Sequence, residues 1–189
     1  MTRLIRFAVV AAAVAFAASA RADDKVENPE FKNWSKFKAG TSVTLKMTTE
    51  AGGQTFGATT TNKLIEVKDD KLVMESEMTS TFMGKDNKLP AQKRDIVKTL
   101  DKAPTGVDPK TGKPDGTTEE GKEKVKIGGT EYECKWYKFK SKQKLPTGEE
   151  EVEGQIWMSD DVPGMVVKMT TKMKSGGMSM EATEITIKK

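Results

Sequence analysis

Alternation of apolar and polar residues, broken by short glycine turns, is the feature that most constrains the fold of this chain. The clearest example is the segment 72–82, where Leu72, Met74, Met78 and Phe82 occupy one side. Glutamates and threonines occupy the other side. A period of two is typical of a strand that is buried on one face only. The chain is therefore expected to be mainly β.

Similar patterns predict further strands, one through Val43 and Met47 and others over about 55–68, 90–98, 122–127, 130–144, 150–159, 165–174 and 178–187. Tight turns separate most of them, at Gly52-Gly53, 69–71, Gly128-Gly129 and Gly176-Gly177. Short hairpins join antiparallel neighbours, and long strands twist and curl the sheet that they form. We predict a single curved antiparallel sheet of about eight strands, a half-barrel built as a meander.

A short helix is expected ahead of the first strand, over about 28–37. Asn28 can cap its N-terminus, and Pro29 suits the first helical position. Phe31, Trp34 and Phe37 then recur at helical spacing, so that three aromatic rings share one face. We expect this aromatic face to dock the helix onto the rest of the protein.

The first 22 residues have the pattern of a cleavable secretory signal peptide. Arg3 and Arg6 precede an apolar run over 7–18, and small residues then lead to a cleavage site between Ala22 and Asp23. The alternative is an uncleaved membrane anchor, but the run is shorter than the roughly 20 residues of a spanning helix. We predict an exported protein, periplasmic or secreted, with one β domain over 23–189. A mobile loop is expected at about 101–120, where proline, glycine and charged residues dominate.

Charge and reactive side chains exclude several classes of function. The chain carries 32 Lys and Arg against 28 Asp and Glu, and cleavage would remove three arginines and no acid. The nearly balanced, interleaved charge that remains does not form the basic stripe that nucleic acid requires. The chain has no histidine and one cysteine, Cys134, so neither a histidine-based catalytic site nor an internal disulfide can form. We expect no enzyme activity, no cofactor and no metal, and we expect Cys134 to be a small buried residue.

Methionine is the unusual residue of the composition, with 11 in the chain. Most of the methionines fall in phase with Val, Leu or Phe on an apolar strand face, which is consistent with a packed core. Flexible methionines also line surfaces that accept varied apolar ligands. A third possibility is Cu(I), because thioethers are soft ligands and Met178 and Met180 share one face of a strand.

Two segments resemble exported half-barrel proteins of the LolA/LolB-like lipoprotein-carrier type, and also uncharacterised secreted proteins of planctomycete-type bacteria. One is the aromatic helix that runs from Asn28 into the strand at Val43. The other runs from Gln155 through Trp157, a turn that ends in Val162-Pro163-Gly164, and on to Lys168. In carriers of this type the concave face of the sheet holds acyl chains. The resemblance implies a cavity lined by Met74, Met78, Phe82, Met165, Val167, Met169 and Met173.

The sequence therefore predicts an exported, non-enzymatic protein whose partner is a lipid or another apolar ligand, held in the concave face of the sheet. The alternative is a structural or interaction domain of the cell envelope, whose partner is another envelope protein. A cavity above about 300 Å³ with a methionine lining would favour the ligand, and a filled core would favour the alternative.

Overall fold

The fold is that of a computed structural model, which describes residues 25–82, 84–102, 104, 106–108, 111–145 and 148–188. The expected signal peptide and its cleavage point between Ala22 and Asp23 lie outside the described residues.

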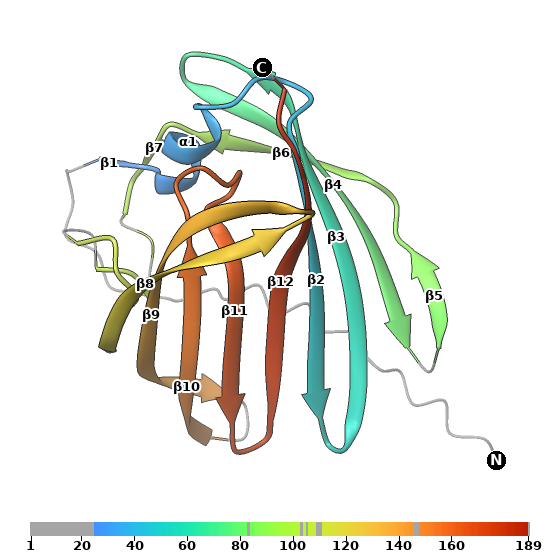
Figure 1. The fold of residues 1–189 in the computed structure, drawn as a ribbon, viewed down its shortest axis with the longest axis vertical. Coiled ribbons are helices and arrows are strands. Elements are labelled where there is room, and N and C mark those ends of the chain that lie inside the picture. The colour runs from blue at the N-terminus through green and yellow to red at the C-terminus, as the bar shows by residue number, and fades with distance from the viewer. Residues whose placement is uncertain are drawn as a thin grey trace.

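The described residues form one short helix and twelve strands (Figure 1). The elements in chain order are β1 (Val26–Glu27), α1 (Pro29–Trp34), β2 (Ser42–Ala51), β3 (Gln54–Val67), β4 (Lys71–Phe82), β5 (Lys85–Lys88), β6 (Gln92–Val97), β7 (Thr99–Leu100), β8 (Thr117–Ile127), β9 (Thr130–Leu145), β10 (Gly148–Met158), β11 (Val166–Met173) and β12 (Gly176–Thr186). Gly128 and Gly129, both at positive φ, make the predicted two-residue hairpin between β8 and β9.

Ten of these strands form one antiparallel sheet in the order β5-β4-β3-β2-β12-β11-β10-β9-β8, with β6 also paired to β4. The sheet is curved and its two edges do not meet, which confirms the predicted half-barrel meander (Figure 1). It has ten strands where about eight were predicted. The strand that matches none of the predicted segments, β5, has the sequence Lys-Asp-Asn-Lys, and its four side chains are exposed. It therefore shows no apolar alternation that a sequence pattern could reveal.

The centre of the sheet joins the first long strand to the last. β12 pairs with β2 from Gly176 opposite Ala51 to Thr186 opposite Ser42, with one bulge near Thr183. Every other pairing in the main sheet links strands that are close in the sequence. The β2–β12 pairing therefore holds together two meanders, β2 to β6 and β8 to β12, that would otherwise be separate sheets.

One face of the sheet, here called the inner face, carries Val43, Leu64 and Met74. Leu64 and Met74 are directly paired, and Val43 pairs with Asn62, two residues before Leu64. All three are buried in the core together with Phe31 and Trp34 of α1. The side chain of Asn28 accepts a hydrogen bond from the backbone N–H of Glu30, as the sequence predicts for a helix N-cap.

The core lies toward one end of the long strands. Figure 1 shows α1 near the upper end, whereas the β2–β3 and β11–β12 hairpins turn at the lower end. The β8–β9 hairpin reaches β12, where Gly128 lies beside the carbonyl oxygen of Thr183. This hairpin adds Ile127 and Cys134 to the same core.

Two sequence boundaries differ from those of the structure. The segment expected to be a loop over about 101–120 ends earlier, because β8 begins at Thr117 and Val107 bridges to Pro114. The last hairpin turns just before Gly176, so that Gly176 and Gly177 begin β12. In both places a strand is paired through residues whose own composition favours a turn.

Cys134 is confirmed as a buried residue, with 2% of its surface exposed. Burial raises the pKa of its thiol, and the nearby carboxylate of Glu123 acts in the same direction. Below the raised pKa the thiol is protonated, and the protonated form does not react as a nucleophile.

We expect Cys134 to resist alkylation in the folded protein. At about pH 8, iodoacetamide should modify the native chain at least tenfold more slowly than the chain unfolded in urea, since both access and thiolate population are reduced. Mass spectrometry of timed samples measures the two rates. Equal rates would show that the thiol is accessible and ionised in the native state.

Candidate ligand-binding face

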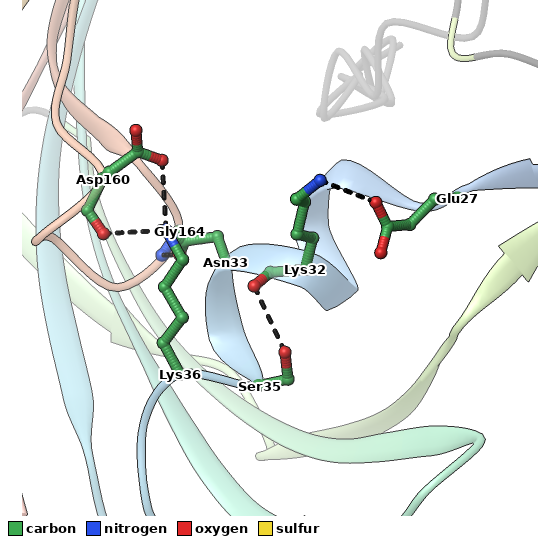
Figure 2. Close-up of polar contacts among 7 residues, drawn as sticks. All are labelled: Glu27, Lys32, Asn33, Ser35, Lys36, Asp160 and Gly164. Atoms are coloured by element: carbon green, nitrogen blue, oxygen red, sulfur yellow. Dashed lines mark hydrogen bonds and ion pairs between the residues drawn. The ribbon is translucent and has the colours of Figure 1, made fainter.

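Helix α1 is attached to the loop between β10 and β11 by Asn33, a residue with only 1% of its surface exposed. The amide group of Asn33 donates to the carbonyl oxygen of Asp160 over 3.2 Å. Its oxygen accepts from the backbone N–H of Gly164 over 2.7 Å (Figure 2). Lys36 adds an exposed ion pair to the carboxylate of Asp160 at 3.2 Å. One buried side chain therefore makes hydrogen bonds to the backbone near both ends of this loop.

The same helix is attached to the opposite part of the sheet. Glu30 forms a two-pronged ion pair with the guanidinium of Arg94 on β6, and this contact raises the pKa of Arg94. The side chain of Asn28 donates to the carbonyl oxygen of Val97 over 2.9 Å. Because α1 is held on both sides, it covers the upper half of the inner face as a fixed element of the core.

The lower half of the inner face is different, and we call it the open half. Directly paired residues share a face, so the registers extend the inner face down each strand. Nine of its apolar side chains are partly or largely exposed: Met47, Phe56, Met78, Phe82, Ile156, Met169, Met173, Met178 and Met180. Val152, on β10, is buried. None of the nine belongs to the core cluster or packs against it.

Small residues separate the long side chains of the open half. Ala58 pairs with Met47, and Thr171 pairs with Met178. Gly154 also lies on this face, where the ring of Phe139 lies over it at 2.3 Å from the position that a Cβ would take. Phe56 and Phe82 stack with ring centroids 5.2 Å apart at the β3–β4 side. The open half is thus an apolar, methionine-rich surface in which small residues alternate with long side chains.

The seven predicted lining residues lie in three different environments of the structure. Met74 and Val167 lie in the packed core, at 0% and 1% exposed. Met165 is a loop residue with a positive φ of 64°, just before β11 begins. Met78, Phe82, Met169 and Met173 lie on the open half.

The remaining residues of the open half were not among the seven. Met47, Met178 and Met180 come from the two central strands, between the strands that carry Met78 and Met169. Their alternation with threonine, lysine and serine is visible in the sequence. It does not reveal that β2 and β12 lie side by side.

Two hollows on the surface of the described residues have other linings. One, of about 320 Å³, is bordered by Lys113, Glu120, Gly121, Lys122, Lys135 and Tyr137. The other, of about 240 Å³, is bordered by Glu151, Glu153, Lys172, Met173 and Lys174. Both are bordered mainly by charged residues, and neither is the cavity that the resemblance implies.

Metal-binding clusters of the usual donors do not occur in the described part of the chain: no three side chains of His, Cys, Asp or Glu come together there. Among the same residues, no helix has the length and hydropathy to span a bilayer.

No family model and no curated protein matches the sequence. Solved structures align with it at TM-scores below 0.5. A Bacteroides fragilis protein with a YmcC-like fold, inferred to be exported, aligns with a TM-score of 0.48 at 10% identity over 79% of this chain and 97% of its own. A Parabacteroides distasonis protein inferred to be a lipoprotein has the same TM-score and identity over 79% and 96%.

A third structure, an inferred outer membrane lipoprotein-sorting domain from Vibrio parahaemolyticus, aligns with a TM-score of 0.28 at 11% identity over 83% of this chain and 89% of its own.

Removing the Asn33 side chain should loosen the helix from the sheet. We expect Asn33→Ala to lower the free energy of unfolding by about 2 kcal/mol or more, because two hydrogen bonds are lost and a buried N–H and C=O lose their partner. Lys36→Ala, which removes only the exposed ion pair, should cost less than about 1 kcal/mol. Urea unfolding followed by tryptophan fluorescence measures both. Similar losses for the two variants would show that Asn33 is not the main attachment.

Proposed function

We propose that this chain is an exported, non-enzymatic protein that binds an acyl chain or another apolar ligand on the open half of its inner face. The observation that carries this proposal is the contrast between the two halves of one face. The upper half is covered by α1, whereas the lower half presents nine apolar side chains at the surface. Contiguous apolar surface of this kind is typical of interaction sites.

The chemistry of the open half fits an elongated, flexible ligand. Methionine side chains have three rotatable bonds and a polarisable sulfur, so they adapt to an irregular apolar partner. Covering one such side chain completely is worth roughly 1.5–3 kcal/mol. The small residues between the methionines leave space for a chain to lie along the face.

The composition of the open half also supports a binding role without catalysis. On β2, β11 and β12 its other members are threonine, alanine and glycine, for example Thr49, Ala51 and Thr171. At its β5 side the register adds Lys85, which pairs with Phe82. General acid–base chemistry requires titratable groups that converge on a substrate. The inner-face positions of the three central strands carry no such group.

Native mass spectrometry tests the proposal most directly. The protein is purified from the envelope of its own cells without detergent and sprayed intact. We expect an additional mass that corresponds to a lipid and that is lost on denaturation. If the mass is that of the bare chain, or of the chain with a second protein, the role of an envelope structural or interaction domain is favoured.

Two neighbouring residues of β12 provide a matched pair of variants. Met180 lies on the open half, and Ser179 lies on the opposite face and is exposed. Met180→Glu should weaken binding of an uncharged fluorescent acyl probe about tenfold or more, because it removes apolar contact and places a carboxylate beneath the ligand. Ser179→Glu should leave the affinity within about twofold. An equal effect of both variants would place the ligand elsewhere.

A further inference from the structure

Three methionines of the open half lie in one row across the centre of the sheet. Met47 on β2 is directly opposite Met180 on β12, and Met180 is directly opposite Met169 on β11. Ala58 and Ile156 end the row on either side. The row joins residues that are far apart in the sequence, and it exists only because β12 pairs with β2.

The register places these side chains on one face and within reach of one another. Adjacent strands lie about 4.8 Å apart, and directly opposite Cβ atoms are about 4.5–5.5 Å apart. Met47 and Met169 therefore flank Met180 at about one strand spacing each. The thioether of methionine is carried on three rotatable bonds, so the two outer sulfurs can turn toward the central one. Met178, two positions along β12 on the same face, offers a fourth sulfur.

Packing does not account for the row. Met74 is the methionine that fills the core, with 0% exposed surface. Met47, Met169 and Met180 are partly exposed, and none packs against the core cluster. The three residues are therefore partly open to solvent, from which a small ion can approach.

We propose that Met47, Met180 and Met169 form a thioether site for a soft monovalent cation, Cu(I) or its analogue Ag(I). Soft sulfur ligands select Cu(I), whereas carboxylates and imidazoles suit harder or divalent ions. Along β2 and β12 the nearest residues on the same face are Leu45, Thr49, Met178 and Ala182, which are uncharged. A neutral sulfur site of this kind discriminates against Zn²⁺ and Cu²⁺.

Competing thiol and imidazole donors are scarce in this chain. The chain contains no histidine, and the thiol of Cys134 is buried with a raised pKa. Thioethers carry no ionisable proton in water, whereas thiol and imidazole sites must lose protons to bind a metal. The affinity of a thioether site should therefore stay constant between about pH 5 and 8, which separates it from any site built on Cys134.

The test is a titration of the delipidated full chain with Ag(I), and with Cu(I) under anaerobic conditions against a coloured Cu(I) chelator. We expect one tight equivalent of either ion, no tight Zn²⁺, and shifts of the methyl resonances of the three methionines. Met180→Leu removes the central sulfur at nearly constant side-chain volume. It should lower the affinity for the metal about 10–100-fold. Met158→Leu, a methionine of β10 that lies outside the row, is the control and should bind as the wild type does.

Three outcomes would overturn the thioether site. The protein could fail to take any Cu(I) from the chelator, or Met180→Leu and the wild type could bind the metal with equal affinity. The third is a metal affinity that rises steeply with pH. The site does not depend on the acyl ligand, because metal stoichiometry and co-purified lipid are measured separately. Circular dichroism of Met180→Leu establishes that the variant is folded. If the variant is not folded, Met47→Leu and Met169→Leu remove the outer sulfurs one at a time, and each should lower the affinity for the metal.

Discussion

The pairing of β2 with β12 is the interaction on which the rest of the structure depends. It joins the two meanders into one sheet, and its inner-face residues run from Val43 in the core down to the open half. Without it, each meander would expose an apolar face and two free edges, which are sites of aggregation. The pairing of β2 with β12 closes a loop that contains almost the whole domain. It is therefore expected to form late in folding, after most of the chain has collapsed.

The two halves of the inner face differ because the residues along each strand change. Toward the core the strands carry Val43, Leu64 and Leu72, rigid or bulky side chains that pack against the aromatic residues of α1. Farther down they carry methionine, threonine, alanine and glycine. A helix of six residues cannot cover strands of ten or more. Asn33 and Arg94 fix it at the end where the side chains are large enough to fill the space beneath it.

The sequence predicted what depends on neighbouring residues and missed what depends on distant ones. Alternation and turn residues were sufficient for the long strands and most of their hairpins, and Asn28 and Pro29 were sufficient for the capped helix. The β2–β12 pairing has no local signal, because either strand could as well be an edge. For the same reason Met78 and Met169 were predicted as lining, but the central methionines between them were not. The pattern of β4 also identified the face of Met74 without showing that the core extends that far along the strand.

Methionine at the centre of the open half allows the sheet to stay stable while it exposes an apolar surface. β-Branched residues would fit the strands better, and Val43 and Val167 occupy such positions in the core. A row of valines at the surface would give a flat, rigid, apolar ladder that favours association with another sheet. Flexible thioethers next to Ala58 and Thr171 give a surface that can rearrange around a ligand or turn its sulfurs toward one ion. The choice of residue, more than the topology, therefore makes this face suited to binding.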